Sequence, residues 1–331
     1  MKAAFLVDKN KFVCGEAPKP TIADGEALLA VEACAFCGSD IHDAARAPKQ
    51  PRTPGHEFAG TVAQIKAPSL GFREGDQAVI NPLMTCGKCR FCATGQEHLC
   101  ATRAVIGCQT PGGFAEFAKV PAANLRRLAP GLRHEVATLC DPLAVAIHAA
   151  DLAGDIRGKN CLVFGAGPLG LLMVHVLKLR GAAFVAVSDI ARPRLARAVK
   201  FEPSMIIDAG ADGDYTTLKG MSIDICVELA GGSSPALAKA ILTVRRGGLV
   251  LQVAQRPPTE VICAQLIFGE KRIQGVFGQT GRNFDQALEM LGNGTTPGNL
   301  LLTDFFTLDN IQQAFDRARN PEALKVIVRP G

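Results

Sequence analysis

Short apolar runs separated by turn residues fill the first part of the chain. Gly and Pro punctuate the gaps, as at Pro54-Gly55 and Thr110-Pro111. Alternating apolar and polar positions of this kind are typical of strands that are buried on one face. The pattern predicts a β-rich, irregular domain with strands at residues 3–7, 27–32, 58–65, 77–80 and 114–120.

The pattern changes after Pro130-Gly131, where apolar residues take helical spacing over 135–152. Strands and helices then alternate, which predicts a parallel sheet with helices on both faces. The strands are expected at 161–164, 184–187, 205–207, 223–227 and 249–253, and the helices at 169–179, 194–199 and 235–245. A closing helix, strand, helix and strand at 284–291, 301–306, 308–318 and 324–328 could extend either domain.

Composition agrees with a soluble globular protein of two domains. The 331 residues are 48% hydrophobic and 20% charged, enough to bury a sizeable core. The net charge of +5 is scattered rather than gathered, so nucleic-acid binding is not expected. The most apolar stretch, 161–179, is interrupted by glycines, a proline, a histidine and a lysine, so no membrane span is expected. The amino terminus does not read as a secretory signal, and twelve cysteines without one fit a reducing compartment. The cytoplasm is the expected location.

A cluster of four cysteines lies within residues 86–100. Cys86, Cys89, Cys92 and Cys100 can offer four sulfurs to one tetrahedral Zn²⁺ and leave no position open for substrate. Two disulfides or four unrelated thiols are the alternatives. The spacing favours a structural zinc lobe, so the catalytic site is expected elsewhere.

A glycine-rich turn follows the strand at 161–164. Gly165, Gly167 and Gly170, with Pro168 and Leu169 between them, form a G-x-G-x-x-G turn between a buried strand and an apolar helix. Such a turn lets backbone N–H groups approach a pyrophosphate, although a merely structural turn is the alternative. The context of strand, turn and helix predicts dinucleotide binding.

Asp189 ends the next predicted strand, about 20 residues after the turn, where a carboxylate can bind the adenosine ribose. This favours NAD over NADP, although Arg192 and Arg194 follow closely and an arginine here can hold a 2′-phosphate. A helix N-cap is the alternative role for Asp189.

Candidate ligands of a catalytic zinc lie in the first domain. Cys37, His56 and Glu57 supply a thiolate, an imidazole and a carboxylate, which together can hold one ion and leave a position for substrate. His56 and Glu57 are adjacent, so both reach one ion only if Gly55 bends the backbone; otherwise Glu57 lies behind the ligands.

Other polar residues near these ligands have candidate roles in catalysis. Ser39 and His42 are suited to carrying protons, and Asp40 to fixing the ring of a liganding histidine. Asp141 is expected to coordinate zinc or orient its water, or else to act only as a helix N-cap.

These motifs, in this order, resemble the zinc-dependent medium-chain dehydrogenase/reductases, and among them the sorbitol and threonine dehydrogenases. The resemblance covers nearly the whole chain, and its motifs lie at residues 37–42, 54–57, 86–100, 112–116, 141–145 and 165–170. It implies a GroES-like catalytic domain at residues 1–140, a Rossmann domain at 141–275 and a carboxyl-terminal segment, 276–331, that returns to the catalytic domain. It also implies a homodimer or homotetramer.

The function expected from the residues and the resemblance is hydride transfer between a small secondary alcohol and NAD(P). The alcohol would be a polyol, a cyclitol or an amino alcohol, with zinc as Lewis acid and Ser39 and His42 in a proton relay. A non-catalytic NAD(P)- and zinc-binding redox sensor or structural relative is the alternative.

Overall fold

The computed structural model describes residues 1–67, 70–255, 257–261 and 263–330. Residues 68, 69, 256, 262 and 331 lie outside this description. They belong to the predicted segments 1–140, 141–275 and 276–331. The chain divides into two compact units: unit 1 is residues 1–141 with 280–331, and unit 2 is residues 142–279.

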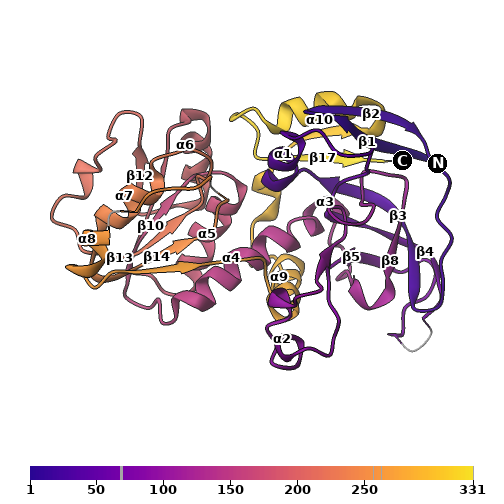
Figure 1. Cartoon of the computed structure of the whole chain (residues 1–331), viewed down its shortest axis with the longest axis horizontal. Helices are drawn as coiled ribbons and strands as arrows, with labels where there is room; N and C mark the ends of the chain where they lie inside the picture. Colours follow the sequence, from indigo (N-terminus) through magenta and orange to yellow (C-terminus); the bar gives the residue numbers. More distant parts are fainter. Residues whose placement is uncertain (68–69, 256, 262, 331) are drawn as a thin grey trace. The chain divides into compact units, whose positions relative to one another are not determined.

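Unit 1 is built on a seven-stranded sheet in the order β16-β17-β3-β4-β5-β9, with β8 also paired to β3 (Figure 1). Two further strand pairs, β1–β2 and β6–β7, flank it. The strands are β1 Lys2–Asp8, β2 Lys11–Glu16, β3 Glu26–Ala35, β4 Glu57–Ile65, β5 Gln77–Ile80, β6 Leu83–Met84, β7 Ala104–Val105, β8 Phe117–Pro121, β9 Leu125–Arg127, β16 Leu302–Thr307 and β17 Lys325–Arg329. The helices are α1 Gly38–Ala44, α2 Arg90–Ala93, η2 Glu97–Leu99, η3 Ala122–Asn124, α3 His134–Ala137, α9 Gly281–Gly292, η6 Gly298–Leu301, η7 Leu308–Asn310 and α10 Ile311–Ala318.

Unit 2 holds a six-stranded, wholly parallel sheet in the order β12-β11-β10-β13-β14-β15. Helices pack on successive strands of this sheet: α5 on β10 and β11, α6 on β11 and β12, and α7 on β13 and β14. The doubly wound α/β fold predicted for this part is confirmed. Its elements are β10 Asn160–Phe164, α5 Pro168–Leu179, β11 Phe184–Asp189, α6 Arg192–Ala198, η4 Val199–Phe201, β12 Met205–Asp208, η5 Thr216–Leu218, β13 Ile223–Glu228, α7 Ala236–Thr243, β14 Val244–Gln252, α8 Cys263–Ile267 and β15 Arg272–Gly275.

Some predicted boundaries are wrong. The helix expected over 135–152 is two helices, α3 and α4 (Cys140–Ala153), because the chain turns at Thr138, whose hydroxyl donates to the Glu135 carbonyl at 2.7 Å. The helix expected over 235–245 ends at Thr243, where β14 already begins. The sequence pattern also missed elements that are short or carry mostly polar and exposed residues, namely β2, β6, β7, β9, β15, α1, α2 and α8.

One helical stretch in the described part of the chain, His134–Ala153, is long and apolar enough to cross a membrane. Most of it, 78% of its most apolar window, is buried inside the protein, as expected of a core helix.

An aromatic cluster forms the centre of the unit 1 core. Phe36 packs at ring-centroid distances of 4.4 Å from Phe114, 5.8 Å from Phe12 and 6.0 Å from Phe315. Pairs of this kind contribute roughly 0.5–1.5 kcal/mol each beyond area burial. Phe36 directly precedes Cys37, so the packing of this ring fixes the backbone from which the Cys37 thiol projects.

The cysteine lobe is a loop closed at its base by the β6–β7 pair, and it contacts the amino terminus of α9. Glu97 Oε1 accepts a hydrogen bond from the Gly281 N–H at 2.5 Å, at the first residue of the helix. Nearby, Arg126 Nε donates to Asp285 Oδ1 at 2.5 Å. A carboxylate at a helix amino terminus satisfies an N–H that lacks an intrahelical partner.

Replacing Glu97 with Ala should lower the free energy of unfolding by about 1 kcal/mol, because the Gly281 N–H and the positive end of the α9 dipole lose their anion. Urea unfolding measures the change. Glu97→Gln keeps an acceptor oxygen and should retain most of the stability. Equal stability of the wild type and the Ala variant would show that this contact contributes nothing.

Candidate functional site

Three adjacent strand ends meet at one edge of the unit 1 sheet. In the order β17-β3-β4, β3 runs antiparallel to both neighbours, so its carboxyl end lies beside their amino ends. Ala35 at the end of β3 pairs with Glu57, the first residue of β4, and with Ile327 of β17. Cys37, which follows β3, and His56 and Glu57, at the start of β4, therefore lie close together at this edge of the sheet.

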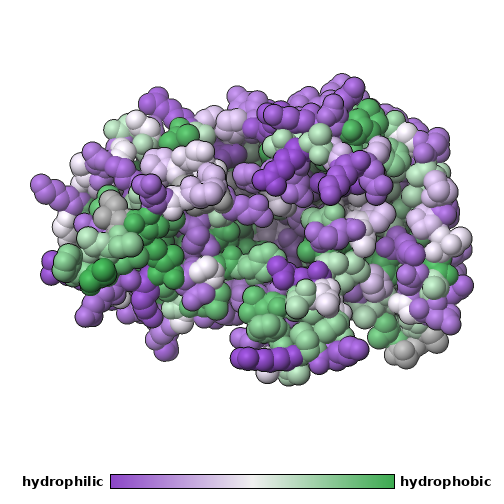
Figure 2. All heavy atoms as spheres, viewed as in Figure 1, coloured by the Kyte–Doolittle hydropathy of each residue, from purple (hydrophilic) through white to green (hydrophobic). Residues whose placement is uncertain are grey.

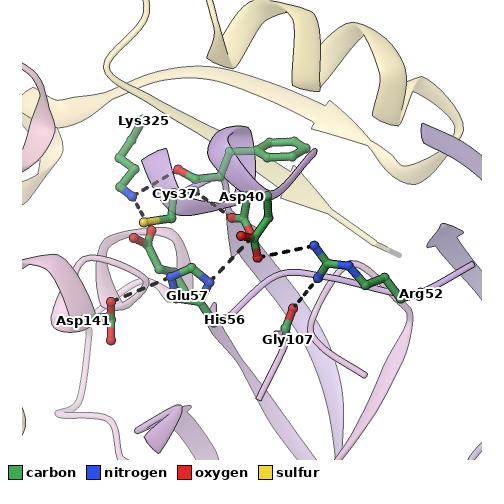
Figure 3. Close-up of polar contacts among 10 residues, drawn as sticks. Cys37, Asp40, Arg52, His56, Glu57, Gly107, Asp141 and Lys325 are labelled. Carbon is green, nitrogen blue, oxygen red and sulfur yellow. Dashed lines mark hydrogen bonds and ion pairs between the residues drawn. The ribbon is translucent and has the colours of Figure 1, made fainter. Parts of the chain in front are cut away.

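Cys37, His56 and Glu57 come together at this edge (Figure 3). Their candidate ligand atoms all lie within 4.8 Å of one another, and His56 and Glu57 are buried. Gly55, directly before His56, has a φ of +98°, so the backbone bends here as expected if His56 and Glu57 are both to reach one cluster. A Cβ at Gly55 would also approach Cys34 Sγ to 2.6 Å, so other residues are excluded there.

Sequence reasoning missed Lys325, the first residue of β17. Its side chain is 3% exposed, and its ammonium donates to the Phe36 carbonyl at 3.1 Å and forms an ion pair with Glu57 Oε2. The only signal was a lysine inside the apolar run from Ala323 to Val328.

Burial dominates the electrostatics of the Glu57–Lys325 pair. It raises the pKa of Glu57 to about 7, although the Lys325 charge acts to lower it. Burial acts to lower the pKa of Lys325, but the charges of Glu57, Cys37 and Asp141 and the hydrogen bond to Glu57 together outweigh it, and the pKa is raised. The second oxygen, Glu57 Oε1, is buried and has no hydrogen-bond partner within the described structure.

Two carboxylates flank the His56 ring. Asp40 Oδ1 lies 3.6 Å from His56 Nδ1, and Asp141 Oδ2 lies 4.0 Å from Nε2. Burial lowers the pKa of His56, but the charges of Asp40 and Cys37 outweigh it and the pKa is raised well above the ordinary value. Asp40 also accepts from the Cys37 N–H at 2.9 Å and so ties the thiol's backbone to the same carboxylate that faces the histidine.

Of the other predicted residues of this site, Ser39 and His42 follow Cys37 closely in the chain, whereas Asp141 belongs to a distant segment. Ser39 and His42 are on α1, where Ser39 is half-buried and His42 is exposed. Asp141 lies in the first turn of α4, and its side chain is 13% exposed.

The four cysteines of the lobe also converge: their sulfur atoms lie within 4.8 Å of one another. Backbone N–H groups point at the sulfurs, as when the Cys89 N–H donates to Cys86 Sγ at 3.3 Å. A bond from the Cys86 N–H lowers the pKa of Cys100 to about 6, whereas burial raises that of Cys92 to about 11. All twelve cysteines are free thiols.

The glycine-rich turn of unit 2 has the form expected of a phosphate-binding loop. Gly165 has a φ of +104° and approaches the loop after β13, while Gly167 precedes α5 and has open space where a Cβ would be. A Cβ at Gly170 would lie 1.8 Å from the Gly165 carbonyl oxygen, so this residue permits the close helix–strand contact.

Asp189 connects the glycine turn to the segment after β11. Its carboxylate accepts from the Ala166 and Ala191 N–H groups, both at 2.8 Å. Arg194 Nη1 lies 3.8 Å from it, and Arg192 instead pairs with Asp208 at 3.1 Å.

Comparison with known proteins identifies the family of the chain. The Alcohol dehydrogenase GroES-like domain matches residues 23–130, and the Zinc-binding dehydrogenase domain matches residues 168–293. An L-threonine 3-dehydrogenase of Bacillus velezensis is 30% identical over 99% of this chain and 98% of its own length. This chain belongs to the zinc-dependent alcohol dehydrogenase family.

Solved structures of other dehydrogenases share the fold of this alcohol dehydrogenase. A short chain alcohol dehydrogenase from Escherichia coli CFT073, complexed with NADH, matches with a TM-score of 0.92 at 26% identity and covers 99% of both chains. A zinc-binding dehydrogenase from Sinorhizobium meliloti 1021, bound to NADP, matches with a TM-score of 0.91 at 26% identity over 99% of both chains. The predicted combination of a GroES-like and a Rossmann domain is thereby confirmed, as is the predicted zinc-dependent alcohol dehydrogenase.

The residues present fit the metal that the family implies. Half-buried Cys37 and buried His56 and Glu57 offer sulfur, nitrogen and oxygen donors, and Glu57 Oε1, which has no hydrogen-bond partner in the described structure, is an acceptor that a cation would satisfy. The four sulfurs of the lobe form a second, all-thiolate donor set that suits a closed zinc site.

Replacing Lys325 with Met should lower the free energy of unfolding of the zinc-free protein by about 3 kcal/mol, since it leaves a buried carboxylate unpaired. The pKa of Glu57 is already above its unfolded value, so the folded state binds more protons and stability falls as pH rises from about 4.5 to about 7. Without Lys325 this pKa rises further, so the loss should be larger at about pH 8 than at about pH 5.

Urea unfolding at the two pH values measures the effect of the Lys325 variant. The matched control is the double variant Glu57→Gln with Lys325→Met, which removes both charges and should recover at least half of the lost stability. A penalty that is the same at both pH values would contradict the assignment of the loss to the Glu57 charge.

Proposed function

We propose that this enzyme oxidises and reduces a secondary alcohol flanked by polar groups, such as a polyol, a cyclitol or an amino alcohol. The observation that carries the proposal is the largely buried Cys37–His56–Glu57 cluster, together with a separate, all-cysteine cluster. The L-threonine 3-dehydrogenase relative, which by its name acts on an amino-hydroxy compound, supports this substrate class. A non-catalytic role would not require a buried mixed donor set of this kind.

In this proposal Cys37, His56 and Glu57 hold the catalytic zinc, with Asp141 beside His56 as a further ligand or an orienting group. Zinc in such a site supplies Lewis-acid activation of the substrate hydroxyl. Asp40 orients the His56 ring through Nδ1. The Ser39 hydroxyl and the His42 imidazole carry the substrate proton toward solvent, in keeping with the exposure of His42.

Cys86, Cys89, Cys92 and Cys100 hold a structural zinc that fixes the lobe against α9. We assign the catalytic role to residues 1–140 together with 276–331, and the cofactor role to residues 141–275. Twelve free thiols favour the cytoplasm as the location of the enzyme.

We assign NAD rather than NADP as the preferred cofactor. Gly165, Gly167, Pro168, Leu169 and Gly170 would receive the pyrophosphate at the amino terminus of α5. Asp189 is a carboxylate at the end of β11, where it would accept ribose hydroxyls and repel a 2′-phosphate. Arg194 lies near enough to Asp189 to offset part of its charge.

A homo-oligomer formed through the β15 edge of the unit 2 sheet is also proposed. β15 is the last strand in the sheet order, and all four of its residues are exposed, so its outer backbone groups can pair with a second copy. Ile267 and Phe268, beside it in the chain, are 68% and 80% exposed. Figure 2 shows hydrophobic side chains gathered over this α7–α8 end of unit 2.

Initial rates of NADH and NADPH formation, measured with zinc-loaded protein and a panel of polyols, cyclitols, amino alcohols and simple alcohols, test the proposed reaction. Turnover that is highest with NAD and a polyhydroxy or amino-hydroxy alcohol, and that a zinc chelator abolishes, is expected. Turnover only with NADP would overturn the cofactor assignment. No turnover with any of these alcohols would overturn the substrate class.

Cys37→Ser should reduce turnover at least a hundredfold and lower the zinc content by about one ion per chain, because the thiolate ligand is lost. NADH affinity should stay within about twofold, since the dinucleotide turn lies in unit 2. Metal analysis and NADH titration measure these changes. Cys14→Ser, a half-buried thiol of the same unit, is the control. Full zinc content in the Cys37 variant would contradict its role as ligand.

Phe268→Asp should shift the protein toward monomers in analytical ultracentrifugation, because it places a charge in the proposed apolar interface. Val199→Asp, at a residue of η4 that is 61% exposed, should leave the assembly unchanged. A wild-type monomer, or an assembly unaffected by Phe268→Asp, would rule out this interface.

A further inference from the structure

A second buried carboxylate, Glu228, lies in unit 2 where no part of the proposed reaction uses it. It is the last residue of β13 and is 0% exposed. Burying a carboxylate costs free energy unless hydrogen bonds compensate, so Glu228 is expected to accept several of them. One oxygen accepts from the loop after β13, and the other accepts from the last residue of the neighbouring strand β14.

The first oxygen holds the loop after β13. Glu228 Oε1 accepts from the N–H groups of Ala230 and Gly231, both at 3.0 Å. These two bonds fold the chain back over the end of its own strand. A side chain therefore helps to hold the loop, in addition to backbone hydrogen bonds such as that from the Gly232 N–H to the Gln255 carbonyl at 3.1 Å.

The second oxygen reaches the neighbouring strand. Glu228 Oε2 accepts from Gln252 Nε2 at 2.6 Å, and Gln252 is the last residue of β14 and the ladder partner of Glu228. The same Gln252 nitrogen donates to the Ala254 carbonyl at 2.7 Å. Together, Glu228 and Gln252 connect the loops after β13 and β14 through one chain of hydrogen bonds.

These loops lie at the point of the sheet where a dinucleotide is expected. The order β12-β11-β10-β13-β14-β15 reverses direction between β10 and β13, and open parallel sheets bind ligands outside the carboxyl ends of the strands at such a point. Phe164, the last residue of β10, is the ladder partner of Glu228, and its carbonyl accepts from the Leu229 N–H at 2.8 Å. A Cβ at Gly165 would lie 3.0 Å from the Leu229 carbonyl carbon.

We infer that Glu228 and Gln252 are positioning residues for the nicotinamide dinucleotide, because they hold the loops after β13 and β14 in one conformation against the glycine turn. The inference rests on the proposed cofactor role of unit 2 and goes beyond it by naming groups that do not belong to the glycine motif. A carboxylate suits this position because it only accepts, and all three of its named partners are donors.

Glu228→Gln tests the inference with little change in shape. The amide that replaces the carboxylate puts an N–H₂ group among donors, so either a loop bond or the Gln252 bond is lost. The dissociation constant for NADH should rise at least tenfold in titrations of NADH fluorescence, which no tryptophan disturbs because the chain contains none. Zinc content should be unchanged.

Asp224 supplies a matched control on the same strand. Its carboxylate accepts from the Asn160 N–H at 2.9 Å and from Arg245 Nε at 2.7 Å, so it too connects neighbouring segments. It lies four residues before Glu228, about 13 Å away along β13, near the amino-terminal end of the strand. Asp224→Asn should lower the melting temperature but leave the NADH dissociation constant within twofold.

The outcomes separate this inference from the proposed function. If the wild type binds NADH and Glu228→Gln binds it within twofold as tightly, the inference is wrong while the proposed function stands. If the wild type binds neither NADH nor NADPH, the proposed cofactor role fails first. Should Glu228→Gln not fold, Gln252→Leu carries the same test, with an expected rise of at least threefold, and an unchanged constant overturns the inference.

Discussion

The candidate catalytic site depends on one buried ion pair, between Glu57 and Lys325. Neither charge could stay inside unit 1 alone, because removing either from water costs several kcal/mol unless a partner compensates. The pair also connects the ends of β4 and β17 across β3, and the Lys325 bond to the Phe36 carbonyl holds the backbone just before Cys37. Lys325 therefore both compensates the buried charge of Glu57 and helps to place the Cys37 thiol.

Local sequence signals account for much of this fold and part of the site. Apolar runs marked the buried strands of both sheets, the spacing of Cys86, Cys89 and Cys92 indicated one cluster, and strand, turn and helix agreed around Gly165. These predictions were possible because the residues that interact lie within a few positions of one another in the sequence. A short window of sequence contains the whole physical reason for each.

The remainder of the site depends on contacts that no short window contains. Lys325 reaches the Phe36 carbonyl across 289 residues of chain, and only the pairing of β17 with β3 brings them together. The edge strand β15 has four exposed residues and therefore lacks the apolar pattern by which a strand is recognised. Glu228 ends an apolar strand in the sequence, and its hydrogen bonds to Gln252 and to the loop after β13 can be identified only in the folded structure.

Because residues 142–279 separate the two parts of unit 1, the order of synthesis on the ribosome constrains how the site is completed. Cys37, His56 and Glu57 leave the ribosome early, whereas Lys325 leaves it only after the intervening residues have been made. Until then Glu57 has no ammonium partner, and its burial is opposed by the cost of desolvating an unpaired charge. The buried pairing of Glu57 with Lys325 can therefore form only after the parallel-sheet unit has been translated.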